Sequence, residues 1–426
     1  MNRDDTATTP NSQDRPDHPP QDETPDTPDT RPDAKPDVRP DGQHDAKPGA
    51  KPGADPGADP GANPDARPAN PSNGRRADPP EPPDIDPAST PRAHPAVAFA
   101  RTVLWPRLAR TNTWWTFLVL MVLVAAFSIM RPSQFPTTFN LRNVATDAAV
   151  LLIIGVGMTF VIIMAGIDLS VGSVLVFAGV AAAKTMTAVS GPDAGWGAIL
   201  LGVLAGLAAG AAWGAFNGFL VAKARVPALI VTLGSLGMAL GLAQVMTEGQ
   251  DVRGVPTRFT DTIGNGRVLG VPWLVVIALL VTAVGALVLG TTRFGRRTYA
   301  VGSNAEAARR AGIPVDRHMI AVYALSGTLA GLAGVLSLAR FTTTTIGGHA
   351  NDSLGAIAAV VLGGTSLFGG IGTVVGTLIG VFIPAILQNG FVILGVQPFW
   401  QSVAVGAVLI AAVYADQLRR RGRQRR

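Results

Sequence analysis

Ten apolar stretches, most of them near the length needed to cross a lipid bilayer, occupy the sequence from Trp114 onward. A membrane-spanning helix needs about 20 predominantly apolar residues, because the hydrocarbon core is about 30 Å thick. Helices satisfy their backbone hydrogen bonds without water, so we expect an all-α polytopic membrane protein. The expected spans are residues 114–130, 143–164, 171–189, 197–221, 228–247, 271–291, 319–340, 354–368, 371–390 and 398–416.

The distribution of charge supports a lipid-embedded chain. Residues 1–100 carry 19 of the 29 acidic residues and 11 of the 35 basic ones. The much longer remainder holds only 10 acidic and 24 basic residues. So few acidic residues cannot cover the surface of a soluble domain of that length, whereas a membrane-embedded chain avoids charges because each is costly there.

The first 95 residues are expected to be a disordered tail. They are rich in Pro, Asp, Gly and Ala, and between residues 48 and 68 a proline recurs every four residues. Proline removes backbone donors, and so few apolar side chains cannot offset the entropy of ordering. The tail has no apolar core of a signal peptide, and we expect it to be cytoplasmic and dispensable. The predicted organisation is therefore a tail at 1–95, a membrane domain at 96–418 and a basic tail at 419–426.

Lysine and arginine in the short loops predict the orientation. One side receives Lys223, Arg225, the six arginines between Arg293 and Arg317, and the C-terminal RRRGRQRR. The opposite side has fewer basic residues, several of them diluted by nearby acidic residues. Because cytoplasmic loops carry the excess of Lys and Arg, both termini are expected inside, which an even number of spans satisfies.

A polar stretch, VGSNAEAARRAGIPVDRH at 301–318, interrupts the apolar C-terminal half. Ser303 and Glu306 match the S-x-x-E capping box that opens a helix. Gly312 lies where a helix ends in a residue with positive φ, and Pro314 prevents continuation. Local chemistry alone favours equally a helix that docks on a partner and an ordinary capped connector.

Four motifs resemble one transporter family. They are AGIDLSVGSVL (165–175), PALIVTLGSLGMALGLA (227–243), GRRTYAVGSNAEAARRAGI (295–313) and AIAAVVLGGTSLFGGIGTVVGTLIG (356–380). In this order they resemble the ribose-type (monosaccharide) ABC transporter permeases of the branched-chain amino acid permease superfamily. The resemblance covers roughly residues 110–416 and excludes the N-terminal tail.

This resemblance implies a permease subunit in a bacterial plasma (inner) membrane, not an enzyme. The polar loop becomes a coupling helix on a separate ATP-binding subunit, and the expected coupling residues are Ser303, Asn304, Glu306, Arg309, Arg310 and Gly312. An extracytoplasmic sugar-binding protein and a second permease copy complete the expected assembly. The sequence contains no phosphate-binding Gly-Lys pair, so energy must come from a partner or an ion gradient. No cofactor, metal or nucleic-acid partner is expected.

The chain departs from the family pattern in two places. Ser353-Leu354-Gly355 stands where Glu-Leu-Asp is usual, and Ile371 stands where an arginine often follows paired glycines. Both departures lie outside the coupling loop. They put in doubt any transfer of substrate identity, so the solute is expected to be a monosaccharide of unspecified kind.

Polar residues in or beside the apolar stretches are the candidates for a solute pathway, because amides and hydroxyls can bind sugar hydroxyl groups. Each also has a structural alternative: Asp168 and Ser170 can cap the following helix, and the amides can bond between helices. The capping alternative is favoured for Asp168. The candidates are Asp168, Ser170, Asn217, Gln244, Gln388 and Asn389.

A weak internal similarity indicates a 5+5 inverted repeat. NGF recurs at 217–219 and 389–391, and DLSVGS at Asp168 pairs with DSLGAI at Asp352. Five expected spans separate the copies. Such a repeat would place a central pathway between two inverted halves.

Three other functions remain open. The first is a permease for branched-chain amino acids or nucleosides within the same superfamily. The second is an ion-coupled secondary transporter, for which only Asp168, Asp147 and Lys184 could form an embedded relay, each near the end of a span. The third is a structural or receptor membrane protein, which predicts neither a docking helix nor broken spans.

Overall fold

A computed structural model describes residues 113–190, 195–349, 351–397 and scattered positions between 399 and 414. All of them belong to one compact unit, Pro87–Arg426. The tails expected at 1–95 and 419–426 lie outside the described residues.

Helices make up most of the described chain. Two two-residue strands, β1 (Arg267–Val268) and β2 (Val271–Pro272), pair antiparallel in one small hairpin. The helices are α3 (Thr113–Met130), α4 (Thr138–Ile163), α5 (Val171–Ser190), α6 (Trp196–Ala222), α7 (Ala228–Thr247), α8 (Thr257–Phe259), the π-helix η3 (Thr260–Gly264), α9 (Trp273–Thr291), α10 (Arg293–Ser303), α11 (Ala305–Arg310), α12 (Val315–Phe341), α13 (Asp352–Leu362) and α14 (Val374–Leu394).

Proline and threonine set where several helices begin. The helices α7, α8, α9 and α12 each start directly after a proline, whose fixed φ and missing donor suit that position. Thr137 opens α4 by accepting the N–H of Asn140 at 3.2 Å. Thr373 opens α14 by accepting the N–H of Gly376 at 3.0 Å. These caps satisfy donors that the helix itself leaves unpaired.

Helix α12 lies at the centre of the packing and contacts α4, α5 and above all α6. In α6, four glycines at four-residue intervals face α12, which lets the two backbones approach closely. A Cβ at Gly210 would collide with the carbonyl oxygen of Gly327, and one at Gly214 with that of Tyr323. The glycines of this face are Gly206, Gly210, Gly214 and Gly218.

Seven helices in the described part are long and apolar enough to cross a membrane. They occupy seven of the ten expected positions, and the shorter apolar helix α3 occupies the expected span at 114–130. The last expected span, 398–416, lies mostly outside the described residues. The described chain therefore supports an all-α polytopic architecture but not a count of ten spans.

The expected span at 354–368 is wrong in length. The helix there, α13, has only 11 residues, which rise about 16 Å and cross about half of a bilayer core. It ends at Leu362 because the glycine-rich stretch that follows turns the chain: Gly364, Gly369 and Gly370 all have positive φ. The N–H of Gly370 then donates to the carbonyl oxygen of Ile163 at the end of α4, at 2.8 Å.

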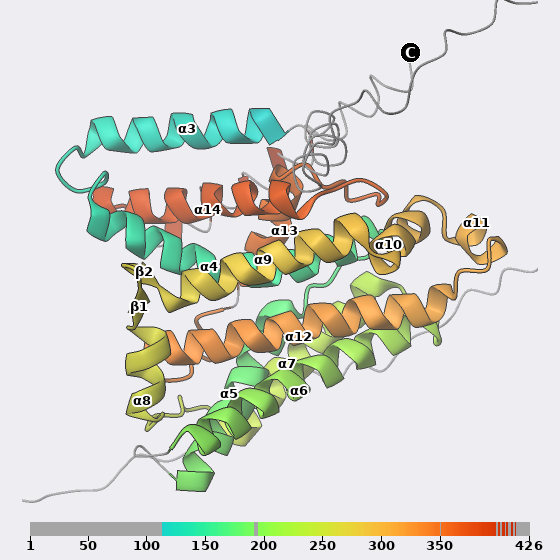
Figure 1. The fold of residues 1–426 in the computed structure, drawn as a ribbon, viewed down its shortest axis with the longest axis horizontal. Helices are drawn as coiled ribbons and strands as arrows, with labels where there is room; N and C mark the ends of the chain where they lie inside the picture. Colours follow the sequence, from blue (N-terminus) through green and yellow to red (C-terminus); the bar gives the residue numbers. More distant parts are fainter. Residues whose placement is uncertain are drawn as a thin grey trace, which may run out of the picture. The chain divides into compact units, whose positions relative to one another are not determined.

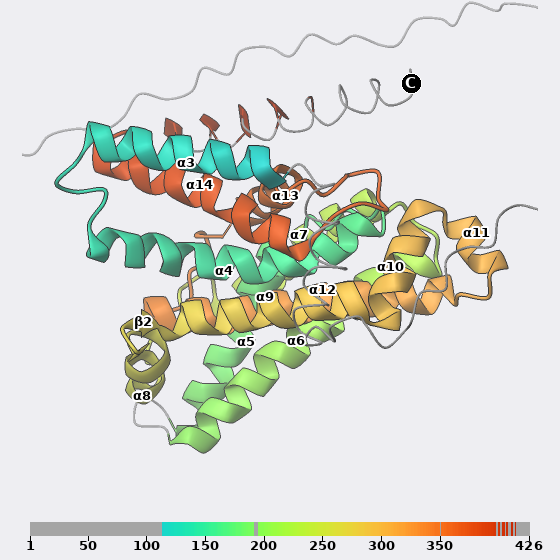
Figure 2. The ribbon, with the colours of Figure 1, turned by 45° about the horizontal axis from the view of Figure 1, so that its top comes forward.

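The two ends of the helix bundle carry different connections. The hairpin β1–β2 and α8 lie at one end, and α10 and α11 lie at the other, in both views (Figure 1, Figure 2). The helix α3 runs beside α14. The long helices α9 and α12 connect the two ends, so a movement of α10 and α11 can reach the interior of the bundle directly.

Candidate functional site

A cavity of about 960 Å³ lies among α4, α13, α14 and the last turn of α12. This volume falls in the range of pockets that hold small solutes. Its wall combines apolar side chains with a cluster of polar and charged ones contributed by four separate segments. The charged and amide groups discussed below are Asp147, Arg340, His349, Asp352, Gln388 and Asn389.

An ion pair between Asp147 and Arg340 joins α4 to the end of α12 across the cavity wall. The side chains are 46% and 21% exposed respectively. The guanidinium of Arg340 also lies over the ring of Phe341, 5.3 Å from the ring centre. The pair is thus packed against apolar surface on one side and open to the cavity on the other.

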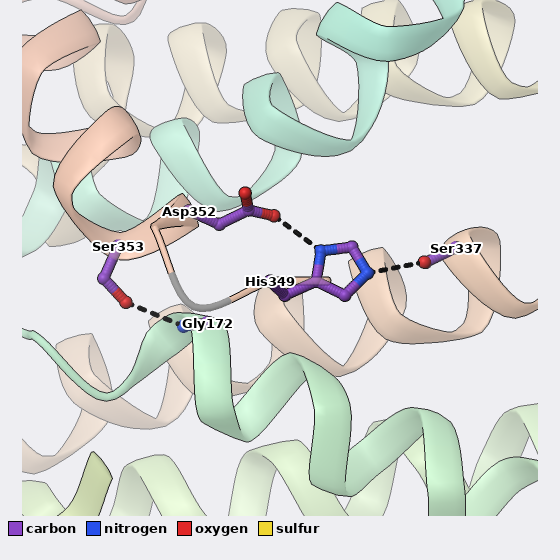
Figure 3. Close-up of polar contacts among 5 residues, drawn as sticks. All are labelled: Gly172, Ser337, His349, Asp352 and Ser353. Atoms are coloured by element: carbon purple, nitrogen blue, oxygen red, sulfur yellow. Dashed lines mark hydrogen bonds and ion pairs between the residues drawn. The ribbon is translucent and has the colours of Figure 1, made fainter. Parts of the chain in front are cut away.

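His349, which also lines the cavity, links α12 to the start of α13 (Figure 3). Its Nδ1 lies 2.6 Å from the carboxylate of Asp352, and its Nε2 lies 2.8 Å from the hydroxyl of Ser337. A carboxylate accepts only, so Nδ1 donates to Asp352, and in the neutral ring Nε2 then accepts from Ser337. The neighbouring Ser353 hydroxyl accepts the N–H of Gly172 at 3.0 Å. The first residues of α5 and α13 therefore meet beside the cavity.

Of the two amides predicted from the second NGF-containing segment, Gln388 is exposed and Asn389 is half-buried. Both line the cavity. Asn389 exchanges two hydrogen bonds with Asn140 of α4, each 2.9 Å long. Its amide is therefore already paired, whereas that of Gln388 is open to a solute.

Asp168, Ser170 and Asn217 form a separate buried cluster that does not line this cavity. The carboxylate of Asp168 accepts the N–H of Ser170 at 3.0 Å and its hydroxyl at 2.6 Å. Asn217 donates to the hydroxyl of Ser170 at 2.9 Å, and Ser326 donates to Asp168 at 3.4 Å. The cluster holds the turn that leads into α5. The remaining predicted pathway residue, Gln244, is exposed on α7 and also lies away from the cavity.

The polar loop contains two helices where the sequence predicted one. Ser303 ends α10, and its hydroxyl donates to the carbonyl of Tyr299. The predicted capping box of Ser303 and Glu306 is therefore wrong. The cap of α11 is Asn304, whose side-chain oxygen accepts the N–H of Ala307 at 2.9 Å. Asparagine is as good a cap as serine, and because Asn304 lies one residue later, α11 begins one residue later than the predicted cap implies.

The other predicted coupling residues lie together on and after α11. Glu306 pairs with Arg310 one turn later at 3.2 Å, and both side chains are well exposed. Arg309 pairs with Asp316 of α12 at 3.0 Å. Lys223, just past α6, reaches the same carboxylate at 3.5 Å. Gly312 has the predicted positive φ, +80°.

The charged wall of the cavity was missed by the sequence interpretation, which considered Asp147 only as part of an ion relay. A usable signal was present: an acidic and a basic residue stand within two separate apolar stretches, where unpaired charges are rare. His349 and Asp352 carried no such signal. Their contact depends on the path of the loop between α12 and α13.

The chain matches one family of transport permeases over more than half of its length. Residues 140–413 match the family model described as "Branched-chain amino acid transport system / permease component". The chain is 42% identical over 307 residues to the ribose import permease protein of Escherichia coli (strain K12), covering 71% of this chain and 92% of the relative.

Two further relatives carry the names of other sugars. The chain is 36% identical over 304 residues to the D-allose transport system permease protein of Escherichia coli (strain K12), covering 71% of this chain and 91% of the relative. It is 36% identical over 335 residues to the L-arabinose ABC transporter permease protein of Azospirillum brasilense, covering 79% of this chain and 95% of the relative. No solved structure matches the chain.

Proposed function

Because the chain belongs to the family of branched-chain amino acid transport permease components, we propose that it forms the translocation pathway for a monosaccharide in an ABC importer. Members of this family are transport permeases, so the chain is not an enzyme. Membership also implies a separate ATP-binding subunit, a substrate-binding protein and a location in the inner membrane. The similar permeases whose names specify ribose, allose and arabinose support a neutral sugar as the solute.

The observation that carries this proposal is the set of polar and charged groups that lie among the apolar side chains of the cavity wall. A pathway for amino acids with branched apolar side chains would need an apolar pocket, with charged groups only for the amino and carboxyl ends. The cavity wall adds several amides, an ion pair and a second carboxylate to its apolar side chains. Hydroxyl groups can donate and accept, so a polyhydroxylated solute can satisfy such a mixed wall.

The six predicted coupling residues are proposed to contact the ATP-binding subunit. Apart from Ala308, the residues of α11 are exposed, and Arg310 and Glu306 extend into solvent. The helix has only six residues, and a helix this short gains little stability of its own. Docking against a partner would provide the packing that it lacks, while Asp316 connects it to α12 and to the end of α6.

Gln388 and Asn389 are proposed as pathway groups on the cavity wall. We propose that Asp168, Ser170 and Asn217 do not contact the solute but fix the start of α5 where it meets α13. Gln244 is exposed on α7, and we propose that it faces either a second permease copy or the pathway between two copies. The second copy is proposed because the resemblance to ABC importer permeases implies a dimer of permease subunits.

We propose an orientation with both termini in the cytoplasm, about ten membrane-embedded helices of which α13 crosses only part of the bilayer, and a disordered tail over residues 1–95. The inverted repeat also remains a proposal. It is supported by the meeting of α5 and α13, because the N–H of Gly172 near the start of α5 donates to the hydroxyl of Ser353 near the start of α13.

Uptake measurements with defined solutes test the proposal. The permease is reconstituted into proteoliposomes with its ATP-binding subunit and each candidate sugar-loaded binding protein. We expect ATP-driven uptake of at least one of ribose, allose and arabinose. Uptake of leucine or of a nucleoside in preference to all three sugars would instead support the alternative within the same family.

A further inference from the structure

The ion pair between Asp147 and Arg340 is more than a brace between two helices. Removing charges from water costs free energy even where the pair is only partly buried, so apolar side chains would hold two helices together as well. Here both partners instead line the cavity. The carboxylate is nearly half-exposed, so part of it faces the space that a solute would fill.

The pair also keeps hydrogen-bonding capacity that the fold leaves unused. A guanidinium has five N–H donors and a carboxylate has two accepting oxygens. Among the described residues, the hydrogen-bonding partner of each of these two side chains is the other. Unused N–H donors of Arg340 and accepting oxygens of Asp147 therefore lie next to each other on the cavity wall.

We infer that Asp147 and Arg340 directly bind neighbouring hydroxyl groups of a neutral polyhydroxylated solute. One hydroxyl donates to the carboxylate of Asp147, and the adjacent hydroxyl oxygen accepts from the guanidinium of Arg340. This inference rests on the proposed function and names the solute-recognition groups of the same cavity. It adds charged groups to the amide-based pathway that the sequence suggested.

The charges around the cavity define the class of solute. Asp147 and Arg340 cancel, and the wall carries a second carboxylate, that of Asp352, which accepts from Nδ1 of His349. A wall without excess positive charge disfavours a sugar phosphate or a free carboxylate, because like charges in a desolvated space repel strongly. An uncharged sugar with two neighbouring hydroxyls meets no such penalty.

The ratio of sugar transported to ATP hydrolysed distinguishes a loss of solute recognition from a loss of complex assembly. The complete complex in proteoliposomes, with loaded binding protein, is assayed with radiolabelled ribose, allose and arabinose. Asp147→Asn, Arg340→Gln and Arg340→Lys should each lower this ratio about tenfold, the effect of losing one charge-assisted hydrogen bond. Arg340→Lys decides between roles, because lysine keeps the ion pair but loses the planar fork. Stimulated ATP hydrolysis should stay at the wild-type rate in all three variants.

Arg258 on α8 provides the matched control, because it is exposed and does not line the cavity. Arg258→Lys and Arg258→Gln should keep the wild-type ratio. With single-deoxy analogues of the transported sugar, the wild-type protein should disfavour one analogue that the Arg340→Lys variant transports as well as the parent sugar.

Two results overturn the inference, because each means that the pair is only structural. The first is an unchanged ratio of sugar transported to ATP hydrolysed in Arg340→Lys. The second is an equal loss of uptake and ATP hydrolysis in all three variants. Failure of the proposed function gives a different pattern: the wild-type complex itself transports none of the three sugars.

Discussion

The close approach of α6 and α12 predicts that a Gly→Ala substitution lowers or raises stability according to where the glycine lies. A methyl group at Gly214 would collide with the carbonyl oxygen of Tyr323 and lie 3.0 Å from the Cα of Gly327. Both neighbours are backbone atoms, so no side chain can turn aside to make room. Overpacking of this kind costs about 1–3 kcal/mol, and the rigid neighbours favour the upper end. Alanine recovers about 1 kcal/mol through its higher helix propensity. Gly214→Ala should therefore lower the free energy of unfolding by about 2 kcal/mol.

Gly237 in α7 is the control, because a Cβ there meets no atom within 4 Å. Gly237→Ala gains the helix propensity without the collision and should raise stability by about 0.5–1 kcal/mol. Unfolding of each variant in detergent micelles, titrated with SDS and followed by circular dichroism, measures both changes. Equal shifts for the two substitutions, or a Gly214→Ala protein as stable as wild type, would refute the packing described for α6 and α12.

Three further predictions concern the coupling loop and the tail. Asn304→Ala removes the acceptor for the N–H of Ala307 and should cost α11 about 1 kcal/mol of stability, which weakens co-purification of the ATP-binding subunit. Ser303→Ala should weaken co-purification much less. A larger loss with Ser303→Ala than with Asn304→Ala would instead support the capping box of Ser303 and Glu306. Gly312→Val places a β-branched residue at a φ of +80° and should reduce partner recovery further at unchanged membrane abundance; wild-type recovery and uptake would mean that α11 is only a connector. Deletion of residues 1–95 should leave insertion and uptake intact, and a deletion variant that reaches the membrane but does not transport would contradict that expectation.

The long helices could be predicted from sequence because a single property, apolar length, determines them. The expected spans at 171–189, 197–221 and 228–247 agree with α5, α6 and α7 to within one or two residues at each end. The glycine-rich stretch after Leu362 was misjudged for the same reason. Its residues are apolar enough to count toward a span, but their backbone turns through positive φ.

The candidate site was harder to predict because it depends on which residues meet across the fold. Gln388 and Asn389 were found as isolated amides in an apolar stretch, and both line the cavity. Asp147 and Arg340 lie 193 positions apart, so that nothing local connects them. The contact of His349 with Asp352 and Ser337 depends on a loop path that carries no periodic pattern.

If this chain is the transmembrane pathway of an ATP-driven sugar importer, its transport depends on ATP hydrolysis by the partner subunit. Purified permease is placed in proteoliposomes alone or with its ATP-binding subunit and binding protein, and uptake of labelled sugar is followed with proton and sodium gradients dissipated. We expect uptake only from the complete complex, at a rate set by ATP hydrolysis, and no ATP binding by the permease alone. Uptake by the permease alone that follows an ion gradient would contradict it.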